Sequence, residues 1–206
     1  MWSWLAVSLS GFGAVSGTKH GHKTQSLFYK VFTFVLLATI VLTQHPIQEY
    51  SYWIAGGLFV SAIADAFHTL TKKRALYFFC FLLAQLCYSK AFWVQLSGEL
   101  VWWLLALLLA ASVVAFFLLL PQLDKVVFPV VIMGIMLIQL TWAAAEVWLI
   151  ESTMNHAIGL MGCIILSLSA LASALNRYRK PLTRAYMWVT GSYFFAHGLI
   201  VASVVL

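Results

Sequence analysis

The sequence predicts an all-α protein, a polytopic membrane helix bundle of about eight transmembrane helices with short loops. Hydrophobic residues make up 63% of the 206-residue chain and charged residues 9%, whereas soluble globular proteins contain about 45–50% and 25%. So few charges would leave a soluble protein without a charged surface to keep it dispersed. Long apolar segments also recur along the whole chain, so we expect residues 1–206 to form a single integral membrane domain.

Polar breaks divide the chain into eight apolar segments. A helix needs roughly 17–25 apolar residues to cross a hydrocarbon core about 30 Å thick. The segments cover residues 2–16, 27–43, 52–70, 75–95, 100–120, 126–150, 156–176 and 185–206. The first is short for a crossing, so we expect it to be tilted or partly interfacial. The breaks between segments are too short to hold a soluble domain.

Basic residues are concentrated in every second loop of the predicted bundle. The loops after the first, third, fifth and seventh segments hold ten of the 12 Lys and Arg residues: Lys19, Lys23, Lys72, Lys73, Arg74, Lys125, Arg177, Arg179, Lys180 and Arg184. The alternate loops have none and carry Glu49, Glu99 and Glu151. By the positive-inside rule the basic loops face the cytoplasm. We therefore expect a multi-pass protein of a bacterial inner (plasma) membrane, with both termini on the outer face and no nucleic-acid partner.

Four charged residues remain inside the predicted spans: Lys30, Asp65, Lys90 and Glu146. Such a residue costs at least about 2.5–3.5 kcal/mol at a helix centre, so it needs a partner or a wet cavity. Counting about 1.5 Å of rise per residue places Lys30 and Asp65 in the cytoplasmic half, and Lys90 and Glu146 in the outer half. We expect Lys90 and Glu146 to form a structural ion pair.

Asp65 is the best starting point for a site, because a carboxylate has no long stem with which to reach the headgroups. His68 lies three residues later on the same helix face. Lys30, at the same depth as Asp65, either binds a substrate or extends to the lipid headgroups.

Three other spans supply further polar candidates. Gln85 and Tyr88 share one helix face, Tyr193 and His197 share another, and Ser169 lies in the seventh span. We expect these side chains to join the Asp65 group in one cavity that opens toward the cytoplasmic leaflet. Taken singly, His197 and Ser169 are also compatible with ordinary helix packing.

Signatures of soluble enzymes are absent from the sequence. The chain has no phosphate-binding glycine loop, no zinc-binding His-Glu-x-x-His helix and no Gly-x-Ser-x-Gly elbow. We therefore expect no cofactor and no metal site with closely spaced ligands, while a metal site assembled across helices stays open.

The order and depth of several short motifs resemble the YhhN family of membrane proteins, which includes the eukaryotic lysoplasmalogenases. The similar stretches are Phe28-Tyr29-Lys30, Ala64-Asp65-Ala66-Phe67, Gln85-Leu86-Cys87-Tyr88, Glu146-Val147-Trp148 and Tyr193-Phe194-Phe195-Ala196-His197. The likeness covers nearly the whole chain. Many family members also carry a Ser-Asp pair late in the seventh span, where this chain has Ser169-Ala170. The second carboxylate of that pattern is therefore missing here.

The resemblance implies hydrolysis of the vinyl ether bond of lysoplasmalogens to a fatty aldehyde and a glycerophospho-alcohol. Asp65, His68 and His197 would then be catalytic. The residues expected to bind a lysophospholipid or another single-chain lipid are Lys30, Gln85, Tyr88, Ser169 and Tyr193.

Two other classes of function use the same polar residues. A non-catalytic lipid-binding or lipid-transport bundle would need the cavity but not the chemistry, and the missing second carboxylate favours it. A proton-coupled transporter would carry protons on Asp65 and Glu146. The lack of an internal repeat counts against the transporter.

Overall fold

The computed structural model describes residues 2–19, 22–44, 46–70, 74–119, 127–178 and 185–206. These residues form eight α-helices: α1 (Trp2–Lys19), α2 (Lys23–Leu42), α3 (Glu49–Leu70), α4 (Arg74–Trp93), α5 (Trp102–Leu119), α6 (Val127–Ile150), α7 (Met154–Tyr178) and α8 (Ala185–Val205). Each helix coincides with one predicted apolar segment, so the predicted fold class is confirmed. Six of them, α2 to α4 and α6 to α8, are long and apolar enough to cross a membrane.

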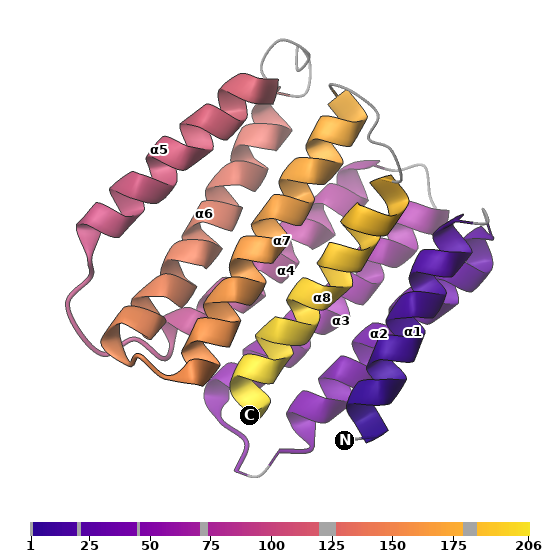
Figure 1. Ribbon diagram of the computed structural model, residues 1–206, viewed down its shortest axis with the longest axis horizontal. Coiled ribbons are helices and arrows are strands. Elements are labelled where there is room, and N and C mark those ends of the chain that lie inside the picture. The colour runs from indigo at the N-terminus through magenta and orange to yellow at the C-terminus, as the bar shows by residue number, and fades with distance from the viewer. Residues whose placement is uncertain (1, 20–21, 45, 71–73, 120–126, 179–184) are drawn as a thin grey trace.

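Seven of the helices form a closed ring. Each of α1, α2, α3, α4, α6, α7 and α8 packs against the next, and α8 returns to α1. Helix α8 also contacts α2 and α3 across the ring. Helix α5 lies outside the ring against α6 and α7, at the edge of the bundle in Figure 1.

Consecutive helices run in opposite directions, so the two termini lie at the same end of the bundle (Figure 1). The opposite end, which we call the basic end, has Lys19, Lys23, Arg74 and Arg177 in the terminal turns of α1, α2, α4 and α7. The end with the termini, the acidic end, has Glu49 at the start of α3 and Glu99 and Glu151 in the connections beside α5 and α6. The other basic loop residues, Lys72, Lys73, Lys125, Arg179, Lys180 and Arg184, lie outside the described residues.

The interior of the ring is packed with aliphatic and aromatic side chains. Leu37, Ile54, Leu58, Leu166 and Ile200 are all fully buried. The large apolar side chains that point outward, such as those along α5, are the surface expected of helices in lipid.

A glycine on α3 makes room for a tyrosine ring of α4. A Cβ atom added at Gly57 would lie 2.4 Å from Cε1 of the Tyr88 ring, far inside van der Waals contact. At the neighbouring Gly56 an added Cβ would meet nothing within 4 Å. Gly57 is therefore the position that lets Tyr88 enter the interior.

We predict that Gly57→Ala lowers the free energy of unfolding by about 1–3 kcal/mol, as overpacking of a tight core does. Gly56→Ala is the matched control, since it makes the same chemical change in the same helix without a clash. Thermal unfolding of both variants in detergent measures the difference. Equal melting temperatures for the two variants would contradict this packing.

Candidate functional site

An ion pair between α2 and α3 lies on the basic-end half of the bundle. Nζ of Lys30 is 3.8 Å from Oδ1 of Asp65, and their side chains are only 14% and 9% exposed. The expectation that these two residues share one depth is confirmed. Because Lys30 is turned inward, it does not extend to the headgroups in this state.

A hydroxyl pair continues the site from Asp65 toward the middle of the bundle. Ser61 lies one turn before Asp65 on α3, and its Oγ shares a 3.1 Å hydrogen bond with the Tyr88 hydroxyl of α4. Both residues are buried. The Tyr193 hydroxyl of α8 also interacts with Ser61 and lies within electrostatic range of Asp65. These contacts bring α3, α4 and α8 together at one point inside the ring.

His197 lies beside this hydroxyl group and is 1% exposed. Its Nδ1 is 2.7 Å from the Tyr193 carbonyl oxygen. Because a carbonyl oxygen only accepts, Nδ1 carries the hydrogen and Nε2 is left as an acceptor. The rings of Phe34, Tyr88 and Tyr193 surround the imidazole at centroid distances of 5.2, 5.5 and 4.4 Å. The ring orientation of His197 is therefore fixed by packing.

Three members of this interior site have polar atoms without a hydrogen-bond partner. They are Oδ2 of Asp65, both amide atoms of Gln85, and Nε2 of His197. Gln85 is 1% exposed, so its amide lies away from lipid. A buried polar group without a partner costs about 1–3 kcal/mol. The site therefore has hydrogen-bonding capacity that a ligand or water can fill.

His68 does not lie in the interior with Asp65. Its side chain is exposed near the end of α3, and its ring contacts the Tyr77 ring at 4.8 Å. The three-residue spacing puts His68 on the same side of α3 as Asp65. His68 is nearly one turn closer to the end of α3, however, and so lies at the exposed rim of the basic end. There it lies within electrostatic range of Lys30, Asp65 and Arg177.

Ser169 is buried, and its Oγ donates a 3.0 Å hydrogen bond to the Val189 carbonyl of α8. This contact joins α7 to α8 one turn before Tyr193. Ala170 is half-buried against the hydrophobic core. The hydroxyl of Ser169 thus has a packing partner of its own rather than a contact with Asp65.

The predicted ion pair between Lys90 and Glu146 is wrong. Glu146 is fully buried, and its Oε1 accepts hydrogen bonds from the Trp142 indole at 2.7 Å and the Val101 backbone N–H at 2.9 Å. Lys90 is exposed. Equal depth does not by itself bring two side chains together. Ser89 of α4 points inward, and Lys90 lies about 100° further round the helix, so it points outward.

The YhhN family model matches residues 25–204. The chain belongs to the YhhN family. Relatives named "Uncharacterized membrane protein YhhN" from Escherichia coli O6:H1, Escherichia coli O157:H7 and Shigella flexneri are each 26% identical over the full length of both chains. No solved structure matches the chain.

Sequence reasoning missed several residues that complete the site of this YhhN family member. Ser61 carries a usable signal, since it lies four residues before Asp65 on the same helix face. Phe34 and Tyr77 are aromatic residues among many in the spans, and nothing in the sequence distinguishes them. The backbone N–H of Val101 cannot be identified as a partner from a side-chain pattern at all.

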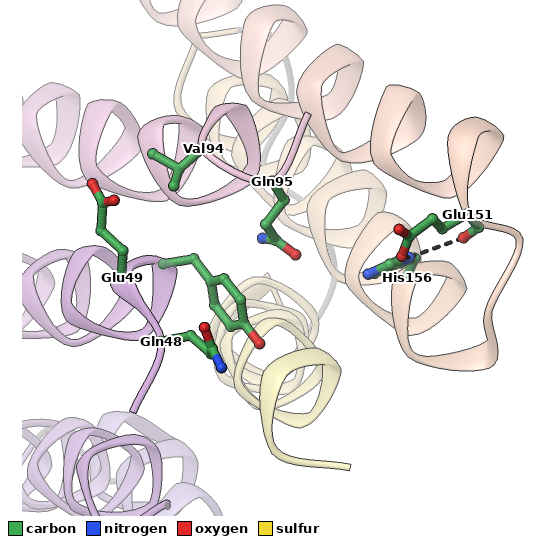
Figure 2. Close-up of a pocket in the computed structure, with 7 residues that line it drawn as sticks. Gln48, Glu49, Val94, Gln95, Glu151 and His156 are labelled. Carbon is green, nitrogen blue, oxygen red and sulfur yellow. Dashed lines mark hydrogen bonds and ion pairs between the residues drawn. The ribbon is translucent and has the colours of Figure 1, made fainter. Parts of the chain in front are cut away.

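Two hollows lie away from Asp65. One of about 450 Å³ is at the acidic end and is lined by Gln48, Glu49, Tyr50, Val94, Gln95, Glu151 and His156. Figure 2 shows Gln95 and His156 pointing into the same space. Nδ1 of His156 forms a 2.9 Å hydrogen bond with the Glu151 carbonyl oxygen. The other, of about 470 Å³, is an apolar groove between α1 and α2. The lipid cavity expected beside Asp65 stays a prediction.

We predict that Lys90 and Glu146 are energetically independent. Glu146→Ala should lower stability by about 1–3 kcal/mol for each donor it leaves unsatisfied, while Lys90→Met should change it little. Residues that share no partner add within about 0.3–0.5 kcal/mol in a double-mutant cycle. Thermal unfolding of the two single variants and the double variant gives the coupling energy. A coupling energy of about 2 kcal/mol or more, well above the additive range of about 0.5 kcal/mol, would show instead that Lys90 and Glu146 form an ion pair.

Proposed function

We propose that this protein is a hydrolase of the lysoplasmalogenase type, which cleaves the vinyl ether bond of a lysoplasmalogen. The observation that carries the proposal is the buried ion pair of Lys30 with Asp65. Ser61, one turn from Asp65, and Tyr88 link this pair to His197, whose Nε2 has no partner. Gln85, one turn before Tyr88 on α4, has an unpartnered amide. A cation and an acid are thus available in the basic-end half, and an acceptor for water lies near the middle of the bundle. The YhhN family membership supports the same conclusion.

Vinyl ether hydrolysis starts with proton transfer to carbon. A carboxylic acid gives its proton to the β-carbon of the alkenyl chain, and the double-bond electrons form the new C–H bond. The oxocarbenium ion that results is attacked by water at the carbon attached to oxygen. The hemiacetal then collapses, so that the C–O bond breaks and an aldehyde and an alcohol leave.

Asp65 is the proton donor in this scheme, and Lys30 controls its state. The contact of 3.8 Å is longer than a charge-assisted hydrogen bond of about 2.7–2.9 Å. An arriving lipid phosphate can therefore take Lys30 as its own partner. Without that cation, a carboxyl group removed from water favours the protonated form. Substrate binding thus favours the protonated form of Asp65, which is the form that can donate a proton.

His197 is the base in this scheme. Its Nε2 is an unpartnered acceptor, and Gln85 offers both a donor and an acceptor for the same water. As the water attacks the cation it loses one proton to Nε2 and keeps the other in the hemiacetal hydroxyl. Asp65 is the only carboxylate on the basic-end half among the described residues, so a histidine takes the role that a second carboxylate has in two-carboxylate hydrolases.

A non-catalytic lipid-binding protein is the second candidate. The observation that favours it is Ala170, which stands where many relatives carry the second carboxylate. The same site would then hold the lipid through Lys30 without cleaving it.

The proposal includes an orientation. The basic end faces the cytoplasm of a bacterial inner membrane, because Lys and Arg accumulate on that side of membrane proteins. The substrate therefore reaches Lys30 from the cytoplasmic leaflet.

We predict that purified protein releases a fatty aldehyde from a lysoplasmalogen, and that Asp65→Asn lowers kcat by at least about 10²-fold, the usual contribution of a general acid. Lys30→Gln should mainly raise KM, by roughly tenfold or more, since a hydrogen bond to a charged group contributes about 1.5–3 kcal/mol. Lys30→Arg should restore part of the affinity.

The controls separate catalysis from binding. Glu99→Gln removes an exposed carboxylate at the other end and should leave the rate unchanged. A 1-alkyl ether lysophospholipid has no double bond to protonate, so it should inhibit competitively without being cleaved. Binding of the lysoplasmalogen without aldehyde release would instead support the non-catalytic candidate.

We predict that a reporter fused after Leu206 lies outside the cytoplasm. Alkaline phosphatase should be active in that fusion and green fluorescent protein dark, because the C-terminus lies at the end away from the basic residues. A bright fluorescent fusion with an inactive phosphatase would reverse the orientation.

A further inference from the structure

By residue count along their helices, the unpartnered buried polar atoms of the described residues follow one another in depth from the basic-end half of the bundle to its acidic end. We call this series the line. Among the described residues there are seven such atoms, on six side chains. Those side chains are Asp65, His197, Gln85, Ser89, Trp93 and Glu146. They come from α3, α4, α6 and α8, which all belong to the ring.

Helix α4 supplies the middle of the line. Gln85, Ser89 and Trp93 follow one another at intervals of four residues, so they lie on one face of α4 about 6 Å apart along its axis. Gln85 and Ser89 are 1% and 2% exposed, and the indole nitrogen of Trp93 is buried. This face therefore carries unpartnered polar atoms over about 12 Å of the membrane's depth.

The two ends of this line are carboxyl groups. Toward the basic end, Tyr88 lies between Gln85 and Ser89 on α4 and contacts both Ser61 and the His197 ring, which connects the line to Asp65. Toward the acidic end, the Trp93 ring contacts the Trp142 ring at 5.2 Å. Trp142 in turn donates to Oε1 of Glu146, while Oε2 of Glu146 has no partner.

The chemistry of these atoms suits water and protons. The Trp93 indole only donates, His197 Nε2 only accepts, Ser89 and Gln85 do both, and Glu146 accepts or, when protonated, donates. No Lys or Arg of the described residues pairs with Glu146, so no fixed cation holds its charge. Chains of Asp, Glu and His inside a membrane protein are the groups that relay protons in pumps and transporters.

We propose that this line is a proton path that connects the acidic end to the Asp65 site and that lets the protein move protons across the membrane. A proton reaches Oε2 of Glu146 and passes through water held by Trp93, Ser89 and Gln85 to Nε2 of His197. It then moves to Oδ2 of Asp65 and leaves at the basic end. One proton enters and one leaves, and no other bond changes.

This path does not depend on the proposed hydrolysis. Glu146, Trp93 and Ser89 have no part in vinyl ether cleavage, and only Asp65, His197 and Gln85 are shared. A protein that binds lipid without cleaving it would still conduct protons along this path.

The test is proton flux in vesicles. The purified protein is reconstituted in liposomes of neutral lipid that contain a pH-sensitive dye, and valinomycin with a potassium gradient sets a membrane potential. The wild-type protein should acidify the interior faster than protein-free liposomes do. Glu146→Gln and Ser89→Val should both reduce the flux to the protein-free level.

Each variant has a safeguard and a control. Glu146→Gln keeps the Oε1 that accepts hydrogen bonds from Trp142 and Val101, so the fold should be retained. Gel filtration and thermal unfolding verify this. Glu99→Gln, an exposed carboxylate at the same end, should leave the flux unchanged. Wild-type flux equal to that of protein-free liposomes would overturn the proposal, as would full flux in folded Glu146→Gln and Ser89→Val. Loss of flux in Glu146→Gln with unchanged aldehyde release would support the path and keep the two functions separate.

Discussion

A hydrocarbon interior contains no water, so each polar side chain in a span needs a partner inside the protein. The ring of seven helices meets this constraint by turning Asp65, Gln85 and Glu146 inward. Several hydroxyl groups bond to a carbonyl of their own helix, as Thr33 does with Tyr29 and Thr141 with Leu137. The groups that are not satisfied this way lie on α3, α4, α6 and α8, and Asp65 and His197 are among them.

Close packing determines what these gathered groups can do. Gly57 admits the Tyr88 ring, and Tyr88 in turn reaches Ser61, one turn from Asp65. Aromatic rings on three sides fix the imidazole of His197, so its acceptor nitrogen has a defined direction. The site is therefore built on rigid helices rather than on loops, which favours precise placement of an acid and a base.

The sequence predicted the helices well because polar residues determine where each helix ends. Polar loops cannot enter lipid, so the breaks between apolar segments coincide with the ends of helices. Depth was also predictable, since residue counting placed Lys30 and Asp65 at one level and the ion pair is present. Rotation about the helix axis was harder to predict. Lys90 and Glu146 share a depth, but Lys90 points out of the bundle while Glu146 points in.

Other features of the site depend on contacts that a sequence pattern does not contain. One partner of Glu146 is the backbone N–H of Val101, just before α5. Every residue except proline has such a group, so no sequence pattern identifies it. His68 was expected beside Asp65 because of its spacing, yet the end of α3 brings it to the rim. Ser169 was expected to face the substrate and instead joins α7 to α8.

A cryo-electron microscopy structure in nanodiscs with a bound 1-alkyl ether lysophospholipid tests the Asp65 site most directly. This analogue keeps the headgroup and the chain but cannot be cleaved. We expect its phosphate at Lys30, its ether oxygen beside Asp65, and a longer separation between those two side chains than 3.8 Å. A phosphate bound elsewhere, with Lys30 and Asp65 still paired, would contradict the assignment of this site to a lipid substrate.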